Sequence, residues 1–269
     1  MNAPTKTSSL LTLAALVGAV TVMGIGVAFA GIQGSKHDMG AGGTSQFGAA
    51  GGGSGEVCVF CHTPHGSDTS AAVPLWNRAL PTASYTRYSA LNTSTLDGTE
   101  APVGSVSLAC LSCHDGTQAM NVMINAPGSG AGTPPAGTAM TGAGAFPKLG
   151  TDLSNDHPIS IQYAGGGLVS TDADGAYTST KFKDKDFNSV YKSTINSVPV
   201  WWVDTDASGT RQKTEMMLYT RTLSGVTQPF VECASCHDPH NTATAASNQV
   251  AFLRTSNTNS EVCLACHNK

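Results

Sequence analysis

The stretch Val57-Cys58-Val59-Phe60-Cys61-His62-Thr63-Pro64-His65 contains the pattern that organises this chain. Two cysteines separated by two residues and followed directly by a histidine recur four times, and the four units together use all eight cysteines. The other units are Cys110-Leu111-Ser112-Cys113-His114, Cys233-Ala234-Ser235-Cys236-His237 and Cys263-Leu264-Ala265-Cys266-His267. This spacing is typical of covalent c-type haem attachment, in which the cysteines form thioethers and the histidine reaches the iron. We therefore predict four covalently bound haems with His62, His114, His237 and His267 as proximal ligands.

The histidine count suggests how the opposite side of each iron is filled. The chain has eight histidines, and the four outside the haem units are His37, His65, His157 and His240. Four irons need four more ligands, so we expect histidine on both sides of every iron. Six methionines follow residue 30, which leaves methionine open as the sixth ligand of one haem.

Paired cysteines have two other common uses. Zinc sites often combine two Cys-x-x-Cys pairs, but they do not need a histidine after each pair. Exported chains with even cysteine counts often form disulfides, but disulfide formation does not explain the repeated histidine either. The same histidine in all four units therefore favours haem.

The first 30 residues have the features of a secretory signal. Lys6 precedes an apolar run from Leu10 to Ala30, which closes with the small-x-small pattern Ala28-Phe29-Ala30. An uncleaved anchor is the alternative, because the run is long enough to cross a bilayer. With cleavage, we expect no membrane span and a secreted, extracellular or cell-surface protein, or alternatively a periplasmic one.

Composition bounds the fold and the partners. The formal net charge is −4, which argues against a nucleic-acid partner. Charged residues make up 12% of the chain, and small residues are abundant, so we expect little aliphatic core apart from the haems. The predicted fold is a mostly irregular chain with short helices and a small β-sheet or hairpin, organised around a stacked column of four haems.

The haem units repeat in a fixed order along the chain. Each half has a lone histidine, then a Cys-x-x-Cys-His-x-Pro-His unit, then a plain unit. We therefore expect one tetrahaem domain over residues 31–269, with di-haem modules at 31–114 and 157–269. An insert over residues 115–230 would carry the strands, which we expect at Ile159–Tyr163, Val198–Val203 and Glu215–Leu223.

The spare histidines can be assigned provisionally to particular haems. His65 and His240 follow proximal histidines too closely to clamp the same porphyrin, so we expect them at the second and fourth haems. His37 and His157 are left for the first and third haems. Either each serves its own module, or His157 takes the first haem and His37 reaches the third haem of a neighbouring chain. The glycine-rich residues 40–55 make such a reach feasible.

Several segments resemble the OmcE-type family of extracellular tetrahaem cytochrome filaments. These segments are Ser35-Lys36-His37-Asp38, residues 57–65, Pro74-Leu75-Trp76-Asn77-Arg78, Asn155-Asp156-His157-Pro158-Ile159, Cys236-His237-Asp238-Pro239-His240 and Phe252-Leu253-Arg254. The resemblance implies histidine-ligated irons, a homo-oligomeric helical filament and a histidine donated across the subunit boundary, a role that suits His37.

Three classes of function follow. The first is electron transfer without catalysis, by a filament or by a soluble shuttle, with redox cytochromes or extracellular acceptors as partners. The second is a multihaem enzyme, which needs an iron with a vacant position. The third is a structural protein whose haems only cross-link the fold. The histidine count favours the first class.

Overall fold

The computed structural model describes residues 31–41, 43, 45, 47, 55–135, 137–141, 147–241 and 252–269. The expected secretory signal, residues 1–30, lies outside the described residues, as does much of the glycine-rich segment within residues 40–55. Among the helices of the described ranges, none is both long enough and apolar enough to cross a bilayer.

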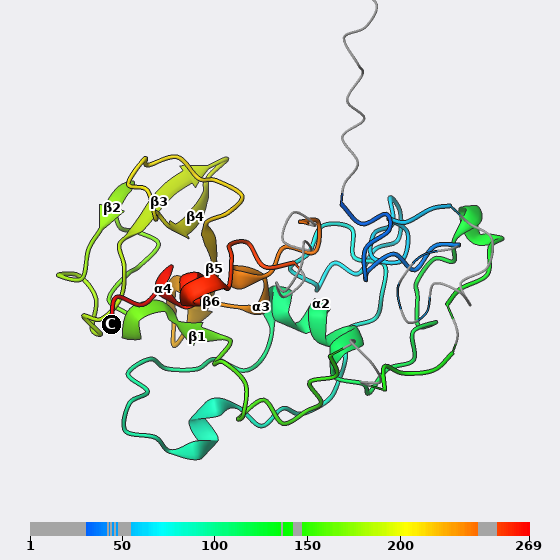
Figure 1. Cartoon of the computed structure of the whole chain (residues 1–269), viewed down its shortest axis with the longest axis horizontal. Coiled ribbons are helices and arrows are strands. Elements are labelled where there is room, and N and C mark those ends of the chain that lie inside the picture. The colour runs from blue at the N-terminus through cyan, green and yellow to red at the C-terminus, as the bar shows by residue number, and fades with distance from the viewer. Residues whose placement is uncertain are drawn as a thin grey trace, which may run out of the picture.

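One antiparallel sheet of six strands gathers at one end of the molecule (Figure 1). Its order is β1-β6-β5-β4-β3-β2, so β2 to β6 form a meander and β1 is added beside β6. The strands are β1 (Ile161–Gln162), β2 (Gly175–Tyr177), β3 (Val190–Ile195), β4 (Val198–Val203), β5 (Met216–Leu223) and β6 (Val226–Val231).

Two tight turns set the register of the meander. Ile195 pairs with Val198, and Leu223 pairs with Val226, so each turn has two central residues. All four central residues have positive φ: Asn196 (49°), Ser197 (64°), Ser224 (51°) and Gly225 (80°). Positive φ at both central positions is the type I′ geometry that matches the twist of antiparallel strands.

The sheet has an apolar core made from the chain's own side chains. Trp201, Val203, Met216 and Phe230 are all fully buried, with no exposed surface. A smaller cluster forms around the first two haem units, where Phe60 packs with other apolar residues beside Cys61 and Cys113. The remaining members of this cluster are Met39, Phe47, Met120 and Met140.

The expected fold class is therefore wrong. Instead of an irregular chain arranged around a haem column with a minor hairpin, the chain forms a six-stranded sheet with a hydrophobic core. The sequence analysis located β1, β4 and β5, but it missed β2, β3 and β6. Low charge and abundant small residues suggested a weak core, yet the sheet buries large apolar side chains such as Trp201 and Trp202, which are 0% and 2% exposed.

Among the described residues the helices are few and short, and three of them contain cysteines of the haem units. The α-helices are α2 (Ser105–His114), α3 (Cys233–Cys236) and α4 (Glu261–Leu264). The 3-10 turns are η1 (Tyr88–Leu91), η2 (Gly128–Gly130), η3 (Tyr163–Gly165) and η4 (Thr258–Ser260). Helix α2 contacts both α3 and β5 and lies between the sheet and the N-terminal segments (Figure 1). This helix therefore connects the N-terminal segments to the sheet.

Candidate haem-binding site

Each Cys-x-x-Cys-His unit folds as a single helical turn. The histidine N–H donates to the carbonyl of the first cysteine at 2.8 Å in the first unit, 3.1 Å in the third and 2.9 Å in the fourth. The second unit is the C-terminal part of α2. Residues three and four apart lie on the same face of a helical turn, so both sulfurs and the imidazole point to the same side. This geometry explains why a haem needs these residues at this spacing.

All eight cysteines are free thiols, so the disulfide alternative is not observed. Cysteine thiols of consecutive haem units lie close to one another. Burial, followed by the neighbouring Cys113, raises the pKa of Cys61 to about 12. A hydrogen bond with Cys233 is the main cause of the raised pKa of Cys110.

The third and fourth units are neighbours in the same way. Burial raises the pKa of Cys266, and the next contribution comes from Cys236. Cysteines of each unit thus lie close enough to influence the pKa of a cysteine in the next unit.

The structure brings six of the eight histidines together in three pairs. Ring centroids are 6.1 Å apart for His37 and His114, 6.1 Å for His62 and His240, and 6.5 Å for His157 and His267. Two imidazoles on opposite sides of one metal ion, with metal–nitrogen bonds of about 2 Å, have their centroids roughly 6 Å apart. Each pair joins one haem-unit histidine to one spare histidine. The residues present therefore fit an iron ligated by histidine on both sides.

Hydrogen bonds fix the orientation of several of these rings. The Nδ1 atom of His62 lies 2.7 Å from the Pro74 carbonyl oxygen, and Nδ1 of His114 lies 2.8 Å from the Pro147 carbonyl oxygen. Nδ1 of His157 lies 3.0 Å from the carbonyl oxygen of the next residue, Pro158. A carbonyl only accepts, so Nδ1 must carry the proton and donate it. Nε2 then keeps its lone pair for a metal, and the acceptor raises the basicity of the ligand.

Burial keeps two of the paired rings neutral, which is the form that binds metal. Burial, followed by the nearby His114, lowers the pKa of His37 to about 4. Burial, followed by His157, also lowers the pKa of His267. The carboxylate of Asp238 lies 3.4 Å from Nδ1 of His240, and this hydrogen bond is the main reason that the pKa of Asp238 falls to about 2.

The pairs differ from those expected from the sequence. His65 was assigned to the second haem, but His37 lies there, beside His114. His240 was assigned to the fourth haem, but it faces His62 of the first unit, and His157 faces His267 of the fourth. The first haem unit thus takes its partner histidine, His240, from the second half of the chain. His65 and His237, the remaining two histidines, are both exposed.

Two of the segments that carry the family resemblance brace the haem units. Arg78 is fully buried and donates from its guanidinium to the carbonyls of Met120 (2.7 Å) and Ala119 (3.1 Å), just beyond the second unit. The N–H of Arg254 donates to the Cys236 carbonyl at 2.8 Å, and its Nε donates to the Ala234 carbonyl at 3.1 Å. These residues hold the haem-bearing turns through main-chain carbonyls.

Sequence reasoning missed the groups that orient the ligands. Pro74 and Pro147 act through their carbonyls, which every residue has, so no sequence signal distinguishes them. Phe252, whose ring stacks on His37 at 4.3 Å with planes 7° apart, belongs to a segment that the resemblance singled out, but its contact was not foreseen.

Comparison with known proteins supports the haem assignment. A family model described as "Doubled CXXCH motif" matches residues 228–269, which contain the third and fourth units. No curated protein was found to match the chain. The matched region has the covalent haem-binding motif of multihaem c-type cytochromes, which are electron-transfer proteins. In this chain that motif lies over α3 and α4, next to strand β6.

Proposed function

We propose that this protein is a tetrahaem c-type cytochrome that transfers electrons and transforms no substrate. The observation that carries the proposal is the presence of three histidine pairs at 6.1 to 6.5 Å, each built from one proximal and one spare histidine. Where both axial positions are filled by side chains, no reactant can coordinate the metal.

The haem supplies a one-electron couple when it is bound. The cysteine thiols would anchor this group, and the histidine pairs at the first, second and fourth units would close both sides of the iron there. Carbonyl acceptors such as those of Pro74 and Pro147 set the basicity of the ligands and thereby tune the reduction potential. Cysteines of consecutive units lie close enough to influence one another's pKa, which supports electron exchange between neighbouring centres.

The count of four haems and the absence of a reactive iron can be tested on the purified protein. A pyridine haemochrome assay with protein quantification should give four haems per chain, and the ferric protein should give only low-spin electron paramagnetic resonance signals. Carbon monoxide should not bind the reduced protein. An iron that binds carbon monoxide would move the protein into the class of multihaem enzymes, and fewer than four haems would contradict the tetrahaem assignment.

We further propose that the protein acts outside the cytoplasm and passes electrons to other redox cytochromes or extracellular acceptors. The support is the signal-like start of the sequence and the site of c-type haem attachment in bacteria. Fractionation of cells that produce the protein, with haem-stained gels, tests this location. Haem-containing protein confined to the cytoplasm would refute it.

Polymerisation into a helical filament is a second candidate, with a soluble shuttle as its alternative. A ligand given to a neighbouring subunit must be exposed, and His65 is exposed, whereas His37 lies beside His114 of its own chain. His65 is therefore the better candidate for a shared ligand. Negative-stain imaging of native material should show fibres that a His65→Ala variant does not form. Single particles in native material would favour the soluble shuttle.

A further inference from the structure

The connection between β4 and β5 has a feature that haem binding does not use. Residues 204–215 read Asp204-Thr205-Asp206-Ala207-Ser208-Gly209-Thr210-Arg211-Gln212-Lys213-Thr214-Glu215. Val203, the last residue of β4, pairs with Met216, the first residue of β5. Since Asp204 and Glu215 directly follow and precede this pair, the sheet itself holds the two ends of the loop together.

The spacing within this loop is that of a calcium-binding loop. The twelve-residue loops of EF-hand proteins have acidic side chains at the first and third positions, an oxygen-bearing side chain at the fifth, glycine at the sixth and glutamate at the twelfth. Here those positions hold Asp204, Asp206, Ser208, Gly209 and Glu215. Serine replaces the usual aspartate or asparagine at the fifth position, and its hydroxyl is also an oxygen ligand.

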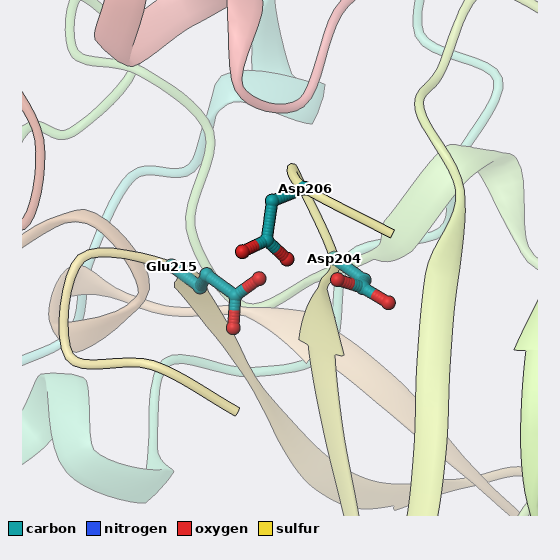
Figure 2. Close-up of side chains that lie close together, drawn as sticks. All are labelled: Asp204, Asp206 and Glu215. Carbon is teal, nitrogen blue, oxygen red and sulfur yellow. The ribbon is translucent and has the colours of Figure 1, made fainter. Parts of the chain in front are cut away.

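The side chains converge as this chemistry requires. Carboxylate oxygens of Asp204, Asp206 and Glu215 all lie within 4.8 Å of one another, and Figure 2 shows the three groups facing a shared space. The hydroxyl of Ser208 lies 3.2 Å from the carbonyl oxygen of Thr210, the residue at the seventh position, which supplies a backbone ligand in such loops. Five residues of one loop thus offer oxygen ligands.

No cationic side chain of the described residues pairs with these carboxylates, and the oxygens of Glu215 accept only main-chain N–H groups, from Thr205 at 3.3 Å and Gln212 at 2.7 Å. Glu215 is 1% exposed. The loop's own Arg211 turns instead toward the sulfur of Met217, at 3.8 Å. Burying a carboxylate beside two others is costly unless a cation neutralises them. A carboxylate buried in this way is a second indication of a bound cation, independent of the sequence spacing.

We propose that residues 204–215 bind one Ca²⁺ ion, with ligands from Asp204, Asp206, Ser208, the Thr210 carbonyl and both oxygens of Glu215. Calcium fits better than magnesium, because magnesium prefers a compact octahedral shell that keeps several waters. The site also reaches a haem unit. The Lys213 carbonyl accepts a hydrogen bond from Arg254 at 3.2 Å, and Arg254 also binds the carbonyls of Ala234 and Cys236. Calcium therefore fixes a loop that braces the third haem unit.

Direct binding is the first test. The haem-loaded protein, freed of metal with chelator, should take up one calcium per chain in equilibrium dialysis read by elemental analysis. The dissociation constant should be about 10⁻³ M or tighter, the range of extracellular calcium modules. Glu215→Gln and Asp206→Asn should each weaken binding at least about tenfold, because each removes a charged ligand. Asp152→Asn, the same chemical change at another aspartate turn, should bind like the unaltered protein.

Limited proteolysis gives a local readout that haem absorption does not disturb. Arg211 and Lys213 are exposed within the loop, so calcium should slow trypsin cleavage after them while leaving cleavage after Lys183 unchanged. The exposed Asp206 makes Asp206→Asn informative even if Glu215→Gln fails to fold. The proposal is overturned if the unaltered protein takes up no calcium at millimolar concentration. It is equally overturned if Asp206→Asn binds calcium as tightly as the unaltered protein does. It is also overturned if magnesium saturates the site at the same concentration as calcium.

Discussion

Replacement of His240 by alanine tests the ligand pairing directly. His240 lies 6.1 Å from His62 between ring centroids, whereas His267 of the fourth unit faces His157. Losing His240 should therefore leave the iron of the first unit with one empty axial position. With four haems per chain, about a quarter of the ferric iron should become high-spin.

The assay is electron paramagnetic resonance of the ferric protein, supported by carbon monoxide binding to the reduced form. A matched control is Asp238→Asn, which weakens the Nδ1 partner of His240 but keeps its ring, so every iron should stay low-spin.

A second background identifies which iron is affected. A Cys58→Ala/Cys61→Ala chain should carry three haems and lack the one that His62 binds. In that background His240→Ala should create no high-spin iron, because the iron that it serves is already absent. One high-spin iron among the three would refute the pairing with His62 and restore the pairing with the fourth unit that the sequence suggested.

Three further predictions concern the scaffold. Arg221 pairs at 3.2 Å with the buried Glu232, which also accepts hydrogen bonds from Ser107 and Ser160; Arg221→Met should therefore lower the free energy of unfolding by about 3 kcal/mol in denaturant titrations. A loss under about 1 kcal/mol would mean that the pair contributes as little as an exposed one. Burial raises the pKa of Glu232 above its ordinary value of 4.5, so its contribution to stability falls as the pH rises through that raised pKa. The deficit of Arg221→Met should accordingly be smaller at pH 4 than at pH 7.5, where the carboxylate is charged and has lost its partner; an equal deficit at both pH values would contradict this reasoning. Trp201→Ala should cost about 3–5 kcal/mol by opening the fully buried sheet core, and an unchanged melting curve would show that the haems alone hold this region.

The sequence indicates the chemistry of the site because that chemistry depends on short-range spacing. A Cys-x-x-Cys-His unit needs only one helical turn to place its sulfurs and imidazole on one side. In the first, third and fourth units the histidine N–H donates to the carbonyl of the first cysteine, and the second unit is the end of helix α2. Strand β4 was also recovered with its bounds, since Val200-Trp201-Trp202-Val203 is a compact run of strand-forming residues. Strand β2 was missed because it is three residues long and begins with glycine.

The sequence by itself indicated which residues can hold haem, since each cysteine pair and the histidine after it are recognised by their short-range spacing. It also contained the ligand spacing of residues 204–215. Only the pairing of β4 with β5, however, brings Glu215 close to Asp204 and buries the Glu215 carboxylate. Only the tertiary structure decided that His240 faces His62 and that His37 faces His114. Such pairings depend on the path of the chain across distant segments, which is set by sheet register and core packing rather than by the residues next to each histidine.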